Sequence, residues 1–315
     1  MGNGSILPPV KHRNPAKNVN CIYATNLILM QRCSTLLPQQ TPPPSSIIEK
    51  KNPCAELSPF ISEYIFRKLH ITAGHPITRI MPMRLVSSID FFLGEPYQTV
   101  DIPSGNTIPF KKCTIRGPRT YSKNLIKISA GNFISFSIRF KPTGLYGLLG
   151  VPVHEFRDEA TDALAVQCEV FSEITERLLG CMSIEDCVAV TETSLIDIKD
   201  KTSPKISPSP AVRELASLIK KTIVPPGIAE LEQHIYLSPR QLERNFVREV
   251  GIPPKLYSRM VRFANVLNFR RKQSGQKWAA LAYEFEYADQ MHLIRDFQTF
   301  LGLNPTDFYP ENFAF

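Results

Sequence analysis

The sequence predicts an α+β protein: a β-rich N-terminal barrel or sheet domain with two following helices, then an all-α C-terminal domain built from two similar units. Three observations lead to this prediction. Short runs of alternating apolar and polar residues, separated by turn signals, fill residues 57–155. Apolar residues then recur at three- and four-residue spacings over residues 160–200. A helical pattern near the C-terminus repeats after 51 residues.

Residues 1–55 predict a disordered or poorly ordered arm. A run of three prolines, Pro42–Pro44, lies between glutamines and serines, and more prolines precede it. Because proline fixes φ and has no backbone N–H, and because little periodicity is visible, we expect no packed core here. The favoured interpretation is an arm without a role or a start assigned too early. The alternative is a basic arm that contacts nucleic acid.

Residues 56–202 predict a β-rich domain that ends in helices. The clearest strand is Phe133–Phe140, where four apolar residues alternate with Ser135, Ser137 and Arg139, as in a half-buried strand with a polar outer face. Leu85–Leu93 alternates less regularly, and Gly94-Glu95-Pro96 is one of several turn signals. Such short, punctuated strands favour an antiparallel sheet or a barrel.

Two helices are expected to close this domain. The first carries Leu164, Phe171 and Leu178 on one face and ends near Gly180. The second begins at Ser183, which forms a capping-box pattern with the acidic residue three positions later. Residues 203–210 contain prolines among serines and predict a linker. The C-terminal domain then spans residues 211–315.

The 51-residue repeat is the most specific feature of the chain. Five residues recur with the same offset: Leu242, Arg244, Phe246, Gly251 and Pro254 match Leu293, Arg295, Phe297, Gly302 and Pro305. Ser238 and Asp289 precede the two copies and are both good N-cap residues. In each copy the leucine and phenylalanine lie one turn apart on one face, and the glycine and proline end the helix.

Each copy also has a short helical stretch before its cap, over Ile228–His234 and Trp278–Phe285. Two short helices, a tight turn and one buried face make a helix-turn-helix unit. Lys255–Lys272 is amphipathic and is expected to join the two units rigidly. Trp278 is expected to pack in the core of the second unit.

The faces opposite the buried leucines carry side chains that suit DNA. Arginine binds guanine O6 and N7 or phosphate, and glutamine reads adenine. A recognition helix presents such residues from its N-terminal turns, and two such helices on one rigid body suit adjacent major grooves, about 34 Å apart. The first unit offers Arg240, Glu243 and Arg244, and the second offers Gln290, Met291, His292 and Arg295. Glu243 has two open roles: it accepts from cytosine N4 or orients an arginine beside it.

The motif Ser238-x3-Leu242-x-Arg244-x-Phe246-x4-Gly251-x2-Pro254, and its copy from Asp289 to Pro305 after Trp278-Ala279-Ala280-Leu281-Ala282, resembles the AraC/XylS family of bacterial transcription regulators. The resemblance covers about residues 210–310. It implies two helix-turn-helix units joined by a linker helix, dimerisation through another domain, and DNA reading by the seven residues just named. Residues 57–150, with Leu57-Ser58-Pro59 and Arg139-Phe140-Lys141-Pro142, resemble an uncharacterised module that often precedes this domain, which implies a sensor or dimerisation role.

Some positions depart from the family pattern. The family often has a small residue in the turn before the second recognition helix, where this chain has Glu286, and Ile235 occupies the equivalent place in the first unit. A β-branched residue at positive φ would be strained. Either the turns adjust, or the second unit binds DNA less well. Met291 contacts a thymine methyl group but makes no hydrogen-bonded readout.

We therefore expect a sequence-specific DNA-binding transcription regulator modulated by its N-terminal domain, not an enzyme, with no cofactor and no metal. Double-stranded DNA is the expected partner; RNA polymerase, a small-molecule effector and a second copy stay open. The alternative is a cupin-like metal-dependent enzyme or metal-binding barrel with an accessory DNA-binding domain, using His70, His75 or His154. A third reading is constitutive DNA binding with a purely structural N-terminal domain.

Composition restricts the partners and the compartment. The net charge is +8, with +4 in residues 1–50, +1 in 51–207 and +3 in 208–315, so a basic field over the whole surface is excluded. The sequence contains no run of 18 apolar residues, so no transmembrane helix is expected. Seven cysteines without a CxxC pair are expected to be reduced, mostly buried thiols of a cytoplasmic protein.

Overall fold

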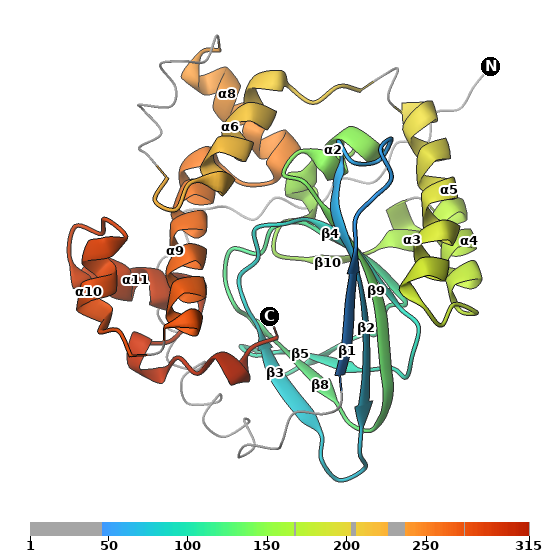
Figure 1. The fold of residues 1–315 in the computed structure, drawn as a ribbon, viewed down its shortest axis with the longest axis horizontal. Helices are drawn as coiled ribbons and strands as arrows, with labels where there is room; N and C mark the ends of the chain where they lie inside the picture. Colours follow the sequence, from blue (N-terminus) through green and yellow to red (C-terminus); the bar gives the residue numbers. More distant parts are fainter. Residues whose placement is uncertain (1–45, 167, 203–205, 226–236, 274, 315) are drawn as a thin grey trace.

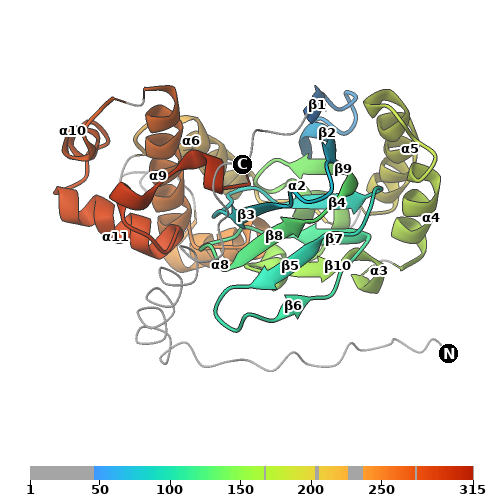
Figure 2. The ribbon, with the colours of Figure 1, turned by 90° about the horizontal axis from the view of Figure 1, so that it is seen from below.

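The computed structural model describes residues 46–166, 168–202, 206–225, 237–273 and 275–314. Two antiparallel sheets form the centre of the molecule (Figure 1). Figure 2 shows the sheets between α3, α4 and α5 on one side and the C-terminal helices on the other. The predicted α+β class, with a β-rich part followed by an all-helical part, is therefore confirmed.

Ten strands make up the two sheets. The six-stranded sheet has the order β1 (Ser46–Lys51), β2 (Ile61–Ile71), β9 (Gly131–Phe140), β4 (Ser88–Phe92), β7 (Cys113–Arg116) and β10 (Ala160–Asp162). The four-stranded sheet has the order β3 (Ile77–Met81), β8 (Asn124–Ile128), β5 (Gln98–Asp101) and β6 (Thr107–Ile108). All pairings between neighbouring strands are antiparallel.

The predicted strand Phe133–Phe140 lies within β9, in the interior of the larger sheet. It pairs with β2 on one side, as in Phe66↔Phe136, and with β4 on the other, as in Phe91↔Phe136. The prediction that the polar side of this strand faces water is wrong, because Ser135 and Ser137 are both buried. Their side of the sheet is covered within the β-domain, where Arg67 Nη1 donates to Ser137 Oγ at 3.4 Å.

Residues 46–51, which the sequence placed in a poorly ordered arm, form strand β1. This strand runs antiparallel to β2, from Ser46↔Leu69 to Lys51↔Tyr64. Ile47 and Ile48 are about half exposed, so the backbone ladder rather than a buried face stabilises β1. A strand without a buried face leaves no apolar alternation to detect. The predicted arm from residue 1 to 45 lies outside the described residues.

Helices cover the outer face of the six-stranded sheet. They are α2 (Gly144–Leu149), α3 (Ala163–Val166), α4 (Cys168–Leu178) and α5 (Ile184–Thr202), with the 3-10 turn η2 (Val153–Phe156). Alternate strand residues such as Ile89 and Phe136 share a core with Phe171 and Leu195 of these helices. The predicted cap of α5 is present, since Ser183 Oγ accepts from the N–H of the residue three positions later at 3.1 Å.

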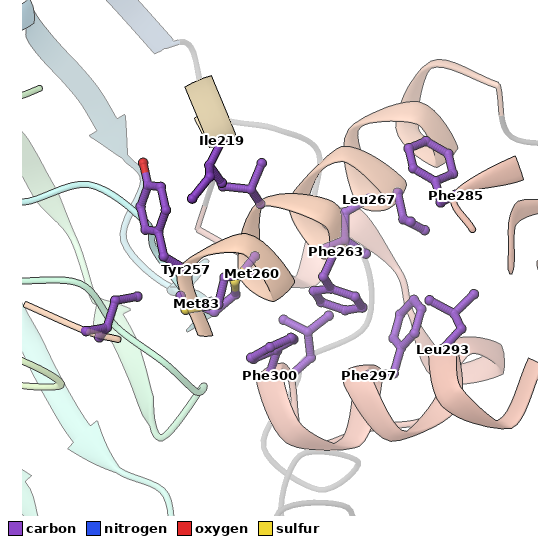
Figure 3. Close-up of a cluster of buried hydrophobic side chains, with 14 of the residues drawn as sticks. Met83, Ile219, Tyr257, Met260, Phe263, Leu267, Phe285, Leu293, Phe297 and Phe300 are labelled. Atoms are coloured by element: carbon purple, nitrogen blue, oxygen red, sulfur yellow. The ribbon is translucent and has the colours of Figure 1, made fainter. Parts of the chain in front are cut away.

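The described residues of the C-terminal part are helical apart from short connections. Its elements are α6 (Pro210–Lys221), α8 (Pro239–Val250), α9 (Pro254–Lys272), α10 (Trp278–Glu284), α11 (Gln290–Phe300), η3 (Pro305–Asp307) and η4 (Pro310–Asn312). Figure 3 shows Phe263 of α9 against Phe297 and Phe300 of α11, with ring centroids 4.9 and 5.1 Å apart. The predicted helix over Ile228–His234 lies outside the described residues.

The helical part shares its core with the β-domain. Ile80, Met83 and Leu125, which lie on or beside strands of the smaller sheet, are buried in the same cluster as α6, α8, α9 and α11. Two backbone hydrogen bonds also cross the boundary: Ser122 N–H donates to the Phe300 carbonyl at 3.0 Å, and Ala314 N–H donates to the Ile80 carbonyl at 2.9 Å. The C-terminal segment thus returns to the edge of β3 (Figure 1).

Candidate nucleic-acid interface

Helix α8 is the recognition helix of the first predicted unit. It begins with a complete capping box, in which Ser238 Oγ accepts from Gln241 N–H at 3.3 Å and Gln241 Oε1 accepts from Ser238 N–H at 3.2 Å. It ends at Gly251, whose φ of +97° is readily adopted only by glycine. Leu242 and Phe246 are fully buried, as the repeat predicts.

The opposite side of α8 carries the predicted DNA-reading residues. Arg240, Glu243 and Arg244 are all exposed. Among the described residues, none of the three side chains takes part in a hydrogen bond or an ion pair. Their charged ends are therefore available for bases and phosphates.

Helix α11 repeats this arrangement. Asp289 caps it by accepting from His292 N–H at 2.7 Å, and Leu293 and Phe297 are fully buried. Gln290, Met291 and Arg295 are exposed. His292 is only partly exposed, because its ring lies edge-on to Tyr287 at 5.3 Å between centroids.

Equivalent residues of the two units therefore end up in equivalent places. Each recognition helix has a polar N-cap, a buried leucine and phenylalanine one turn apart, and a positive-φ glycine after its end, with Gly302 at +73°. The arginines at the repeated position, Arg244 and Arg295, are both exposed. Trp278 packs against Phe297 with ring centroids 4.9 Å apart, as predicted for a core residue.

A buried carboxylate that the sequence did not reveal fixes α11 to the linker helix. Asp296 is fully buried and accepts from Arg259 Nε of α9 at 2.6 Å and from Tyr287 OH at 2.9 Å. Burial, together with the Asp296 charge, raises the pKa of the Tyr287 hydroxyl, so this group stays a donor. The available signal was spacing, since Asp296 follows Leu293 by three residues and lies on the same face.

The turn before α11 contains a residue in the left-handed backbone region. Glu286 has a φ of +53°, although it is not glycine. Its carbonyl accepts from Arg262 Nη1 at 3.3 Å, and the Arg262 guanidinium lies over the Tyr287 ring at 4.1 Å. A non-glycine residue in this left-handed conformation carries strain of about 1–2 kcal/mol. The equivalent residue of the first unit, Ile235, lies outside the described residues.

The three histidines of the alternative hypothesis, a metal-binding barrel, lie on separate elements. His70 is at the end of β2 and its Nδ1 lies 2.9 Å from Asn132 Oδ1, His75 is in the β2–β3 connection, and His154 is in η2. All three are exposed. Within the described part of the chain, no three His, Cys, Asp or Glu side chains form a group suited to a metal ion.

The described cysteines and helices can be compared with the predictions of reduced thiols and of no membrane span. The cysteines whose side chains are described, Cys54, Cys113, Cys181 and Cys187, are free, and two of them are buried. None of the described helices combines the length and the apolar character needed to cross a membrane.

Comparisons with known proteins match two separate regions of the chain. Residues 231–309 match the model of a helix-turn-helix domain, and residues 49–162 match a domain of unknown function, DUF6597. A search of curated proteins finds no match.

Several solved structures are similar over most of their length. ToxT from Vibrio cholerae O395 has a TM-score of 0.42 and 11% identity, covering 78% of this chain and 96% of that one. Unsaturated fatty acid-bound ToxT from V. cholerae strain SCE256 has a TM-score of 0.41 and 10% identity, covering 78% of this chain and 94% of that one. The AraC-like transcriptional activator CuxR has a TM-score of 0.23 and 14% identity, covering 72% of this chain and 86% of that one. TM-scores below 0.5 do not establish a common fold.

The matched helix-turn-helix region contains both capped recognition helices and the linker helix between them. The module before it is the one that the N-terminal sequence resembled. The chain therefore carries an AraC-type helix-turn-helix domain at its C-terminus, the DNA-binding domain of transcription regulators, after an N-terminal DUF6597 domain.

Proposed function

We propose that this regulator reads a specific DNA sequence through two successive major grooves, with α8 in one and α11 in the other. The observation that supports this most directly is the equivalence of the two helices. Each presents an exposed arginine, Arg244 or Arg295, at the repeated position, and each is held by a buried face against the same linker helix. Figure 1 shows α9 running between the two units.

Each exposed side chain has a role that its chemistry suits. Arg240, Arg244 and Arg295 bind guanine edges or phosphates through their forked donors, and Gln290 pairs with adenine. Met291, more than half exposed, contacts a thymine methyl group. In the same proposal His292 donates from the flank of α11, and Glu243 accepts from cytosine or orients an arginine beside it.

We also propose that the β-domain modulates DNA binding, because both recognition helices end against it. Gly251, just after α8, packs against Pro118 and Val153, and the last carbonyl of α11 accepts from Ser122. Arg248 of α8 lies over the ring of Tyr146, 5.3 Å from its centroid. A ligand that shifts these β-domain segments shifts DNA affinity only if it binds the two arrangements with different affinities.

The proposed organisation follows the predicted boundaries, except that the regulatory domain begins with β1. Residues 46–202 form the regulatory domain, residues 203–210 the linker and residues 211–315 the DNA-binding domain. Dimerisation through the regulatory domain, contact with RNA polymerase and a cytoplasmic location are part of the proposal and rest on the family resemblance. Non-enzymatic action is part of it as well.

Selection from a random DNA library with the full-length protein tests the proposal. The expected outcome is a motif with two information blocks about one helical turn apart. Lys127→Ala removes one exposed charge from β8, outside both recognition helices, and should select the same motif. Selection of a single block would restrict sequence reading to one unit, and selection of no motif at moderate salt would contradict the proposal.

A further inference from the structure

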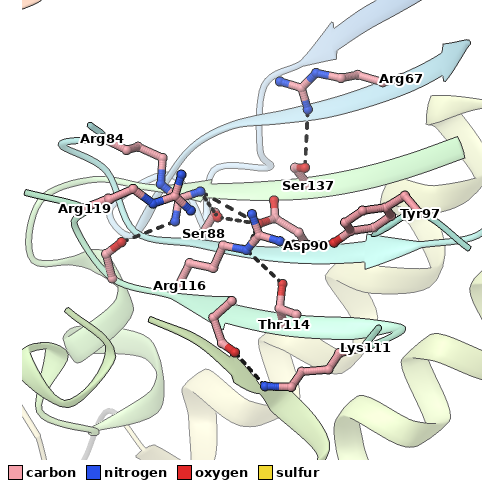
Figure 4. A network of polar contacts seen from close by, with 12 residues as sticks. Arg67, Arg84, Ser88, Asp90, Tyr97, Lys111, Thr114, Arg116, Arg119 and Ser137 are labelled. Atoms are coloured by element: carbon pink, nitrogen blue, oxygen red, sulfur yellow. Dashed lines mark hydrogen bonds and ion pairs between the residues drawn. The ribbon is translucent and has the colours of Figure 1, made fainter. Parts of the chain in front are cut away.

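A cluster of arginines lies inside the β-domain, on the face of the larger sheet opposite its helices. Arg84 and Arg116 pair with the carboxylate of Asp90, and Arg67 and Arg119 lie near this pair (Figure 4). Arg116 Nε lies 3.3 Å and Arg84 Nη1 3.8 Å from Asp90 Oδ2. Asp90 and Arg116 are both buried, so these charges face one another away from water.

Arg119 has no carboxylate of its own in this cluster. It is 6% exposed, and among the described residues its side chain makes one hydrogen bond, a long one of 3.4 Å to the Pro82 carbonyl. Burial and the neighbouring Arg116 lower its pKa to about 10, against the opposing effect of Asp158 and Asp90. A guanidinium with that pKa remains charged at neutral pH. A buried charge without a partner is costly unless something else neutralises it.

The nearby acidic groups are already engaged by other partners. The Asp158 carboxylate accepts from the backbone and hydroxyl of Thr120. Asp101 accepts from the N–H and hydroxyl of Ser104 at 3.0 and 2.6 Å, and Glu159 pairs with Lys123 at 3.1 Å. The cluster therefore carries more positive charge than its own carboxylates balance.

A cavity of about 300 Å³ opens beside these arginines. Arg116 and Arg119 line it together with Lys111, while Tyr97 and Phe110 supply an aromatic wall with ring centroids 5.3 Å apart. Ligand pockets combine an apolar wall with a few polar groups in this way, and this volume is at the lower end of their range. It suits a molecule of about one ring in size, not a polymer.

We propose that this cavity binds a small organic anion, with its carboxylate or phosphate on Arg119 and Arg116 and its carbon body against Tyr97 and Phe110. The planar guanidinium fork matches the oxygens of both head groups. Arg116 remains shared with Asp90, so Arg119 is the residue that the ligand alone satisfies. The sequence did not reveal this site, because a four-residue strand ending in Arg116 gives no sign that the arginine points inward.

One segment of chain connects the cavity to the DNA-binding domain. Arg119 pairs through its backbone with Arg84, and three residues later Ser122 donates to the last residue of α11, Phe300. An anion that draws Arg119 into the cavity therefore acts on a segment bonded to the second recognition helix. This consequence rests on the proposed function, whereas anion binding itself does not.

The test uses the thermal unfolding of the full-length protein without DNA. The probes are benzoate, phenyl phosphate and inorganic phosphate, each at about 10 mM, with benzyl alcohol as the uncharged analogue. We expect at least one of the two aromatic anions to raise Tm by about 2 °C or more, and benzyl alcohol to leave it unchanged. The aromatic anion that raises Tm more shows whether the cavity prefers a carboxylate or a phosphate head group.

Arg119→Gln is the decisive variant, because replacing Arg116 instead would remove the closer of the two arginines that pair with Asp90. Without a probe its Tm should equal or exceed that of the wild type, and the anion-induced shift should disappear. Arg119→Lys should keep part of the shift, and Lys127→Gln, which removes an exposed charge on β8, should keep all of it.

Three results with the probes would overturn the proposal. They are no shift with either aromatic anion, an equal shift with benzyl alcohol, or a shift that persists in Arg119→Gln. A Tm of Arg119→Gln several degrees below that of the wild type would also overturn it, because Arg119 would then be a structural residue. DNA affinity is measured separately by fluorescence anisotropy, so a protein that fails to bind DNA but is still stabilised by the anion refutes the proposed function and not this site.

Discussion

Replacing Gly251 with alanine tests whether the first recognition helix is seated on the β-domain. Gly251 has a φ of +97°, which costs an L-residue about 1–2 kcal/mol. A Cβ at this position would also lie 2.9 Å from Pro118 Cδ and 3.0 Å from Val153 Cγ1. Because both atoms belong to the β-domain, relief requires the two domains to move apart or repack, at about 1–3 kcal/mol. We expect Gly251→Ala to lose about 2–5 kcal/mol of stability.

Gly74→Ala is the matched control. Gly74 has a similar φ of +84°, but a methyl group added there would meet no atom within 4 Å, so only the backbone strain of about 1–2 kcal/mol applies. Urea unfolding measures both variants. The fluorescence of the single tryptophan, Trp278, reports the unfolding of the helical domain, and far-ultraviolet circular dichroism also reports that of the β-domain, which contains Gly74. Equal losses in the two variants would show that the contact between α8 and the β-domain is not tight, and would refute the reasoning.

Three further predictions follow from single contacts. Asp296→Ala leaves Arg259 without its carboxylate and should lower the stability of the helical domain by about 3 kcal/mol in urea unfolding, with an unchanged result counting against the buried pair. Burial opposes ionisation of Asp90, but the neighbouring arginines outweigh burial and lower the pKa of its carboxyl group. The ionised carboxylate therefore stabilises the protein above about pH 4, and this stabilisation is lost as the pH falls further. Asp90→Asn should flatten the loss of stability in acid, and a pH profile identical to that of the wild type would contradict this prediction. Glu286→Gly relieves a positive φ and should raise Tm slightly, whereas a clear fall would show that the glutamate is not strained.

Features set by local chemistry could be predicted from the sequence. The caps Ser238 and Asp289, the buried faces of α8 and α11, and the glycine after each helix all follow from residues within one helix length. The exposed positions of Arg244 and Arg295 follow from the same periodicity. Their contact with DNA stays a prediction.

Features that depend on contacts between distant parts of the chain could not be predicted from the sequence. Whether Ser135 faces water depends on the second sheet that covers it, and β1 is held mainly by its ladder with β2. Asp296 and Arg116 are charged residues at inward-facing positions, where the hydrophobic pattern predicts apolar side chains. Their partners Arg259 and Asp90 lie 37 and 26 residues away, a separation that no local pattern encodes.

The central claim is that α8 and α11 read two separate blocks of one DNA site. The most direct test measures the affinity of the wild type, Arg244→Ala and Arg295→Ala for the selected operator and for operators altered in one block at a time. Each alteration should cost the wild type about 1–3 kcal/mol, and each variant should lose discrimination at one block while keeping it at the other. If both variants lose affinity equally for every operator, the two arginines bind only phosphates, and the claim that both helices read sequence through them is contradicted.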